Sequence, residues 1–269
     1  MTNQKSKEGL IVWHFDYAFT TFYEIETKAV EHLVQKPLTP IEVAPGVSLL
    51  SLIAFNFPEG ALGTLPEFQE LTLSLIVTPD LSRGVPKSAM YILSLGSTNQ
   101  EHLDHCVSYY KLPVYGQFTR VNIQRDTHVV EYEDSNGPIL TMKNVHPRPE
   151  FSKGEHYFQA FVEDAGDIYV ADVIMKGSLF EHQQAGEAGK LWPHPFFRGI
   201  DLDSAEPLVF MQMLHKSGSR GQQFYPRPEK FTAISRSKNE MSVTSTKRAH
   251  METPALEKRA STPPQVSAV

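Results

Sequence analysis

The segment FQELTLSLIV, Phe68–Val77, has a clean two-residue periodicity. Its leucines and its polar residues fall on opposite faces of an extended chain: Leu71, Leu73 and Leu75 on one face, and Glu70, Thr72 and Ser74 on the other. This alternation predicts a β-strand with one apolar face and one polar face. In a cone or barrel the polar face would line a small wet cavity, whereas in an open sheet it would face solvent.

Strand-like segments dominate the sequence on both sides of this one. VSLLSLIAFNF predicts a strand that is buried on both faces, and HYFQAFVED with DIYVADVIM predicts a hairpin that turns at Ala165–Gly166. LIVWHFDYAF places four aromatic side chains on one face: Trp13, Phe15, Tyr17 and Phe19. Two segments, IETKAVEHLVQ and QEHLDHCVSYY, favour short helices. We therefore predict a mainly β (α+β) fold, with a closed antiparallel sheet and one or two short helices.

Three regions of different composition divide the chain. Residues 1–9 are polar and predict a flexible N-terminus, and residues 10–235 hold the strand-rich domain. Residues 236–269 contain no Phe, Tyr, Trp or Ile and are rich in Ser, Thr and Pro. Such a segment buries too little apolar area to offset the entropy of ordering it, so we predict a disordered basic tail.

The charge balance excludes one large class of partners. The formal net charge is −6, and because residues 236–269 carry +3, residues 1–235 carry −9. Nucleic-acid binding needs clustered Lys and Arg, so we predict no nucleic-acid partner. Cys106 is the only cysteine, which rules out an intramolecular disulfide, and no apolar run is long enough to cross a bilayer. We expect a cytoplasmic protein without a membrane partner, and a homo-oligomer stays open.

Four segments, in this order, resemble the acetoacetate decarboxylase-like superfamily: DYAFTTFYEIETKAVEHLVQKPLTP, LLSLIAFNFPEGALG, PEFQELTLSLIV and YYKLPVYGQF. The third is similar to that family's P-Y-x-E-L segment, and the fourth is similar to its G-x-P-K-x-x-x-x-F lysine loop. The resemblance covers roughly residues 10–145 and is generic beyond them. It implies that family's closed sheet, or double-cone barrel, around a cavity for a small molecule.

The resemblance breaks at the residues that perform the family's chemistry. In decarboxylating members, the lysine that follows the loop's proline forms a Schiff base with a keto acid, and a second lysine lowers its pKa. Here Val114 and Tyr115 follow Pro113, and neither can condense with a ketone. The pattern Y-x-L-P-x-[YF] at residues 110–115 is similar to a non-decarboxylating branch instead. Lys111 and Lys143 are the remaining lysines to consider, and an exposed position is the simpler interpretation of both.

Three residues are the catalytic candidates. Glu70 matches the cavity-facing carboxylate of the family's segment and is the candidate general acid or base, whereas Glu67 is more simply a loop carboxylate. Tyr115 is a candidate donor to a developing oxyanion, with a packing role as the alternative. Lys111 completes the set, although its position argues against a Schiff base.

Five further residues are candidates for substrate binding: Arg120, Phe68, Val114, Trp192 and His194. Arg120 would hold a carboxylate in a bidentate pair, and its alternative is a surface pair with Glu131 or Glu133. Trp192 and His194 belong to WPHPFFRGID, a stiff apolar loop that would close over a pocket or serve as a plug or contact.

The motif EHLDHC places His102 and His105 near Cys106 and invites a metal interpretation. No further ligand group with a fixed spacing accompanies it, so we predict no metal site and no cofactor. There is no Walker loop, G-x-G-x-x-G or G-x-S-x-G motif, and so nothing supports a nucleotide-dependent enzyme or a serine hydrolase.

The resemblance implies a cofactor-free lyase or isomerase that acts on a small oxo acid or polyketide-like metabolite. Decarboxylation, dehydration, enolisation and aldol-type cyclisation all fit, and specialised metabolism is the expected setting. The alternative is a small-molecule-binding protein that kept the cavity and lost the chemistry.

Overall fold

The computed structural model describes residues 9–124, 129–143, 152–183, 189–214 and 220–232. All of them belong to one unit of the chain, Met1–Thr232, and the second unit, Ala233–Val269, contains no described residue. The predicted disordered tail and flexible N-terminus therefore fall outside the described residues, except for Gly9.

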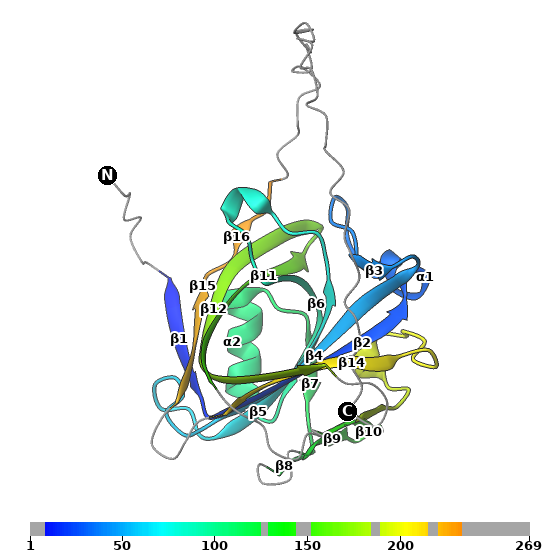
Figure 1. Cartoon of the computed structure of the whole chain (residues 1–269). Coiled ribbons are helices and arrows are strands. Elements are labelled where there is room, and N and C mark those ends of the chain that lie inside the picture. The colour runs from blue at the N-terminus through cyan, green and yellow to red at the C-terminus, as the bar shows by residue number, and fades with distance from the viewer. Residues whose placement is uncertain (1–8, 125–128, 144–151, 184–188, 215–219, 233–269) are drawn as a thin grey trace, which may run out of the picture. The chain divides into compact units, whose positions relative to one another are not determined.

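Twelve strands form the main sheet (Figure 1). They are β1 (Leu10–Phe15), β2 (Tyr17–Glu26), β3 (Glu42–Ala44), β4 (Val47–Phe57), β5 (Phe68–Ile76), β6 (Ser88–Ser97), β7 (Val114–Gln117), β11 (Ser152–Asp164), β12 (Asp167–Gln183), β14 (Glu206–Leu214), β15 (Gly221–Pro226) and β16 (Glu229–Lys230). Their main order is β1-β15-β12-β11-β6-β5-β4-β2-β14. The long strand β12 pairs with β15 through Ile174–Lys176 and with β14 through Ser178–Gln183. The last strand of this order, β14, therefore also pairs with β12.

The predicted mainly β class with short helices is confirmed. The sheet is mixed, whereas we predicted antiparallel pairing throughout. Strand β6 runs parallel to β11 and to β7, and a parallel neighbour requires a long connection in place of a hairpin. Helix α2 (Gln100–Tyr110) lies in the connection between β6 and β7.

The sheet curves around α2, as Figure 1 shows. Its two faces have separate apolar cores. The inner core packs α2 against the concave face, and its large side chains include Trp13, Phe55, Phe57, Phe68 and Tyr225. The outer core lies on the opposite face and contains Leu71, Leu73 and Leu75. The alternation of Phe68–Val77 thus assigns the leucines to the outer core, while Glu70 and Thr72 face the interior that contains α2.

The predicted aromatic face of LIVWHFDYAF is wrong. Trp13 and Phe15 belong to the inner core, whereas Tyr17 and Phe19 belong to the outer core. The chain bends at Asp16, where β1, which pairs with β15, gives way to β2, which pairs with β4. A bend interrupts the two-residue period, so side chains on either side of it need not share a face.

A second, four-stranded sheet covers part of the outer core. It contains β8 (Arg120–Gln124), β9 (Val129–Asp134), β10 (Gly137–Lys143) and β13 (Gly189–Leu191), in the order β13-β10-β9-β8. The predicted hairpin of β11 and β12 is confirmed, and it turns at Ala165 and Gly166, which both have positive φ. Strand β9 also pairs antiparallel with β8 and with β10.

The predicted helix QEHLDHCVSYY is confirmed over its whole length as α2, whereas the first helical segment is shorter than the sequence predicts. IETKAVEHLVQ forms only α1 (Thr27–Val30) and a 3-10 turn (Glu31–Leu33), and further 3-10 turns lie at Leu81–Arg83 and Pro195–Phe197. None of the helices in the described part of the chain is long and apolar enough to span a bilayer.

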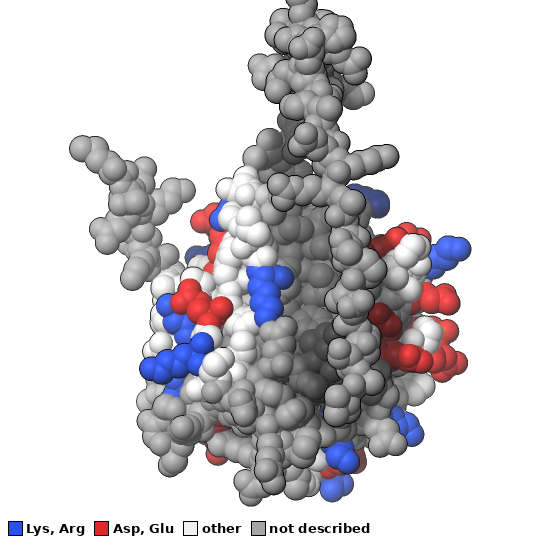
Figure 2. All heavy atoms as spheres, viewed as in Figure 1, with Lys and Arg blue, Asp and Glu red and all other residues white. Residues whose placement is uncertain are grey.

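Figure 2 shows acidic side chains gathered on the side where α1 and β3 lie, and Glu26, Glu31 and Glu42 are exposed there. This agrees with the acidic balance of residues 1–235.

Candidate active site

The interior of the curved sheet contains a small cavity beside α2. Its volume is about 50 Å³, and most of its lining is apolar. The polar side chains that line it are Glu70, Thr72, His102, Cys106, Tyr110, Gln223 and Tyr225. The apolar walls include Ile53, Met90, Ile92 and Phe158.

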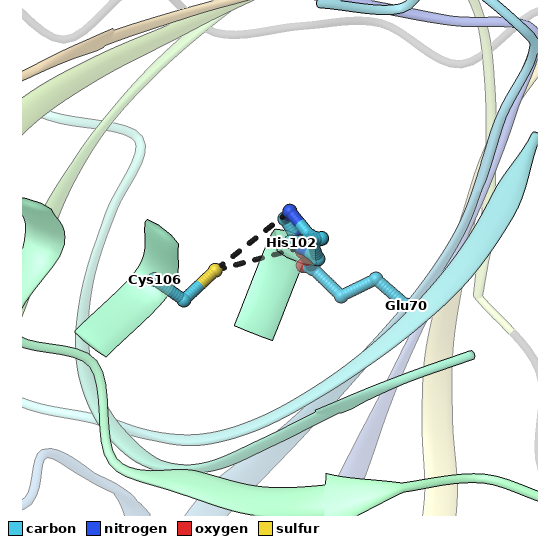
Figure 3. Close-up of side chains that lie close together, drawn as sticks. All are labelled: Glu70, His102 and Cys106. Atoms are coloured by element: carbon cyan, nitrogen blue, oxygen red, sulfur yellow. Dashed lines mark hydrogen bonds and ion pairs between the residues drawn. The ribbon is translucent and has the colours of Figure 1, made fainter. Parts of the chain in front are cut away.

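Glu70 lies near the start of β5 and is 7% exposed. Its carboxylate Oε2 and the His102 Nε2 form a hydrogen bond of 2.7 Å, and Thr72 donates a hydrogen bond of 2.9 Å to the other oxygen, Oε1. A buried carboxylate is stable only when its oxygens are satisfied in this way. The two contacts fix which oxygen points at the imidazole, as the close-up in Figure 3 shows for His102.

Helix α2 presents one face to the cavity. His102, Leu103, Cys106 and Tyr110 are its buried residues, at the three- and four-residue spacing of a single helical face. The helix begins at the cap residue Asn99, whose side chain accepts a hydrogen bond from the His102 backbone, and it ends at Lys111 in the left-handed conformation. Both ends are therefore locally specified by the sequence.

Aromatic rings hold the His102 imidazole in place. The Phe68 ring lies 4.4 Å from it, centroid to centroid, and the Trp13 ring approaches it edge-on at 5.2 Å. Trp13 also donates a hydrogen bond of 2.8 Å from Nε1 to the Tyr110 hydroxyl. Phe68, a predicted binding residue, thus packs behind the imidazole as part of the inner core.

The Cys106 thiol and the two tyrosine hydroxyls at the cavity stay protonated at neutral pH. Burial, followed by the charge of Glu70, raises the pKa of the Cys106 thiol well above its usual value. Burial also raises the pKa of Tyr110 and of Tyr225. These three side chains therefore offer O–H or S–H groups, and an unliganded Cys106 is not a thiolate nucleophile.

A second polar cluster, the His194 latch, consists of Tyr115, Asp134, Asn136 and His194 and lies among outer-core residues. The Phe196 backbone donates to His194 Nδ1 at 3.2 Å, so His194 Nε2 carries the hydrogen and donates to Asp134 Oδ1 at 2.9 Å. Tyr115 donates to the other carboxylate oxygen at 2.6 Å. Through these hydrogen bonds the His194 latch connects the loop around Pro195–Phe197 to the end of β9 and to β7.

The latch predicts a specific acid sensitivity. Burial opposes the charge on Asp134, but bonds from Tyr115, the Asn136 backbone and His194 outweigh it and lower its pKa below 3.8. A depressed pKa stabilises the fold above the unfolded value and loses that contribution as pH falls through the folded value. Asp134→Asn should therefore destabilise the protein by about 1–3 kcal/mol at neutral pH and flatten the loss of stability as the pH falls below about 4.

Urea unfolding across that pH range tests this expectation, and Glu133→Gln is the matched control. Glu133 neighbours Asp134, but its side chain is 45% exposed and pairs only with Arg120 at 3.6 Å among the contacts described. A pH profile of Asp134→Asn that parallels the wild type would contradict the role of the latch.

The predicted site residues do not all converge. Glu70 lines the inner cavity, while Tyr115 and His194 belong to the latch. Arg120 is 73% exposed and borders a separate pocket of about 170 Å³ that Trp192 also lines. The arrangement that we expected, with Glu70, Arg120 and Tyr115 around one substrate, is therefore not present.

The remaining predicted residues lie in the loop after α2. Val114 starts β7, pairs in parallel with Leu95 of β6 and is partly buried against the inner core. Lys111 caps α2, forms an ion pair with Asp164 and lies 4.7 Å above the Tyr169 ring. Both partners of Lys111 lie away from the cavity lining, so its ammonium is engaged elsewhere.

Lys111 is therefore expected to form no Schiff base. Treatment with borohydride and a small ketone should leave the protein mass unchanged, because the Asp164 pair keeps the amine protonated and outside the cavity. Intact mass spectrometry with peptide mapping checks this, with Lys111→Ala as the control. A reduced adduct on the peptide that contains Lys111 would overturn it.

Sequence reasoning missed the pairing of Glu70 with His102 and the place of Cys106 beside them. A usable signal existed, since His102 and Cys106 are four residues apart on a predicted helix. The histidine pair His102 and His105 drew attention instead, but His105 stacks on Tyr109 at 5.1 Å, centroid to centroid.

Comparison with known proteins identifies the class of fold. No protein-family model and no curated protein matches the sequence. Solved structures do match: an acetoacetate decarboxylase aligns with a TM-score of 0.55 and 12% identity, over 84% of this chain and 90% of that one. The acetoacetate decarboxylase of Legionella pneumophila aligns with a TM-score of 0.53 and 11% identity, over 86% and 90%. The chain has the acetoacetate decarboxylase-like fold, and the resemblance seen in the sequence is confirmed at that level.

Proposed function

We propose that the chain is an enzyme that moves a proton on a small carbonyl compound held in the inner cavity. One observation carries this proposal: the 2.7 Å hydrogen bond between Glu70 and His102 lies at the wall of a small, largely apolar cavity. A carboxylate and an imidazole in contact form an acid–base pair, and positioned pairs of this kind contribute about 100- to 10,000-fold to a reaction rate.

Different side chains of the cavity lining would transfer the proton and stabilise the developing negative charge. Glu70 or His102, whichever lacks the shared proton, would accept a proton from the carbon beside a carbonyl, and its partner would return one. Tyr110 accepts a hydrogen bond from Trp13, which leaves its own hydroxyl hydrogen to donate. That hydrogen would stabilise the oxygen on which negative charge develops, the role first predicted for Tyr115.

The size of the cavity favours a small substrate. Its volume of about 50 Å³ is well below the roughly 150 Å³ of an apolar cavity that accepts benzene. A short oxo acid or ketone fits this space better than a polyketide-like intermediate. Enolisation is the simplest reaction, and decarboxylation, dehydration and aldol-type bond formation proceed through the same enolate, so the class is a lyase or isomerase.

The proposed reaction proceeds without a Schiff base. Val114 occupies the position after the loop's proline at which the family resemblance predicts a lysine, and Lys111 is paired with Asp164. Charge on the intermediate must then be stabilised by hydrogen bonds from the cavity wall rather than by an iminium.

Hydrogen–deuterium exchange tests the proposal without knowledge of the full reaction. The protein is incubated in deuterium oxide with a panel of two- to five-carbon ketones and oxo acids, and NMR follows loss of the carbon-bound protons. Accelerated exchange of at least one compound is expected, relative to buffer and to heat-denatured protein. Absence of acceleration for every member of the panel would contradict the proposal.

A small-molecule-binding protein is the second candidate function. The observation in its favour is Val114, since the chain retains the fold of a decarboxylase without the lysine of its loop. The same panel separates the two functions, because a binding protein would shift ligand resonances without exchanging their protons.

A further inference from the structure

Three potential metal ligands meet at the wall of the inner cavity. Glu70 comes from β5, and His102 and Cys106 come from successive turns of α2, as Figure 3 shows. One donor atom from each lies within 4.8 Å of the other two, and all three residues are buried. Imidazole, thiolate and carboxylate are the ligand types that zinc binds in proteins.

The distances are close to those of a tetrahedral site. With zinc–nitrogen, zinc–sulfur and zinc–oxygen bonds of about 2.0, 2.3 and 2.1 Å, tetrahedral ligands lie about 3.4–3.6 Å apart. The Cys106 Sγ is 3.5 Å from His102 Nε2, so this pair already has the required separation. The Glu70 oxygen is 2.7 Å from the same nitrogen and must move away by about 0.7 Å, which rotation about its side-chain bonds can provide.

The charges also balance. A carboxylate, a thiolate and a neutral imidazole carry −2 in total, and a divalent cation makes the site neutral within an apolar wall. Thr72 already orients the carboxylate through Oε1 and would act as the outer-shell partner that metal ligands generally have. Because all three ligands line the cavity, the fourth coordination position faces its interior.

We propose that Glu70, His102 and Cys106 bind a divalent cation of the zinc type, with the fourth position open to a small ligand in the cavity. Binding releases the Cys106 thiol proton, and it requires the neutral His102 imidazole to carry its hydrogen on Nδ1 so that Nε2 is free to bind the cation. The cation and the proposed proton transfer therefore use the same atoms, so occupancy by the metal inhibits that reaction. The metal site does not depend on any turnover.

Cobalt titration of the full chain tests the site. The protein is first treated with a chelator and dialysed, and cobalt(II) is then added while the absorption spectrum is recorded. We expect one equivalent to produce intense visible bands of tetrahedral cobalt and a thiolate-to-cobalt charge-transfer band in the near ultraviolet, and zinc should displace it.

Two substitutions on the same helix make the test specific. Cys106→Ser should abolish the charge-transfer band and weaken cobalt binding by more than roughly 100-fold, since a lost ligand costs more than a lost outer-shell partner. His105→Gln should leave the spectrum unchanged, because His105 stacks on Tyr109 and is not one of the three ligands. Circular dichroism confirms that each variant is folded.

Several results would overturn the proposal. One is the absence of the charge-transfer band in the folded wild type, and another is its persistence in Cys106→Ser. A third is its loss in His105→Gln, which would assign the metal to the two histidines of the sequence motif. If cobalt binds but no compound exchanges protons, the metal site is supported and the proposed function is contradicted. If a compound exchanges protons but cobalt does not bind, the proposed function is supported and the metal site is contradicted.

Discussion

Replacing Glu70 with glutamine is expected to lower the rate of substrate proton exchange by about 100- to 10,000-fold, with ligand affinity nearly unchanged. Glutamine keeps the shape of the side chain and can still accept a hydrogen bond from Thr72 or bond to His102, so the cavity should persist. It cannot take up a proton at neutral pH. NMR exchange rates and ligand titrations on the same samples measure the two effects separately.

Glu67→Gln is the matched control for this experiment. Glu67 lies three residues earlier, is exposed and accepts a hydrogen bond from Asn56 outside the cavity lining. Its substitution should leave exchange unaltered. If Glu70→Gln changes only the affinity, and the wild type binds without exchange, the protein is a binding protein and the acid–base role of the pair fails.

Gly96→Ala is expected to destabilise the fold by about 3 kcal/mol, at the upper end of the usual cost of overpacking. A Cβ at Gly96 of β6 would lie 2.3 Å from Cζ of Phe118 and 2.8 Å from both Cε atoms. The ring cannot simply retreat, because it packs edge-on against Tyr132 and Phe196 at centroid distances of 5.1 and 5.9 Å. Urea unfolding measured by tryptophan fluorescence and circular dichroism gives the free-energy change.

A double-mutant cycle isolates the cause. Leucine at position 118 lacks the ring atoms that would collide with the new Cβ, so Gly96→Ala should cost much less in the Phe118→Leu background. Additive costs of the two substitutions would show that the contact between residues 96 and 118 is not responsible.

Local patterns predicted the elements that depend on neighbours in sequence. The alternation of Leu71, Leu73 and Leu75 with Glu70 and Thr72 correctly separated an apolar from a cavity-facing side of β5. The hairpin at Ala165 and Gly166 was also predicted, since its turn needs residues that tolerate positive φ. Both features arise within a dozen residues, so a short stretch of sequence contains the information.

Predictions failed where the register or the direction of the chain changes. The aromatic period across Trp13 and Tyr17 is unbroken in sequence, but the bend at Asp16 sends the side chains to different cores. The helix predicted in IETKAVEHLVQ is longer than the one that forms. Val30 reaches the outer core from α1, and Val34 reaches it from the extended residue after the 3-10 turn. In each case contacts with distant strands outweigh the local preference.

The candidate site shows the same division. Sequence singled out Glu70, and its strand pattern indicated the face on which it lies. The other groups near it in the structure, His102 and Cys106, come from a helix that starts 30 residues later. Arg120 and Tyr115 follow soon after that helix, but Arg120 belongs to the second sheet and Tyr115 belongs to the His194 latch. Distance along the chain was a poor guide to distance in space.

Sequence by itself determined the mainly β class, the polar face that contains Glu70, and the absence of a lysine directly after Pro113, where Val114 stands, because each is a property of a residue type or a short period. The tertiary structure decided that this polar face lines a cavity and that His102 and Cys106 line the same cavity. The physical reason is the curvature of the mixed sheet: parallel pairing of β6 with β7 requires a crossover, and α2, which forms that crossover, packs against the concave face where Glu70 is buried.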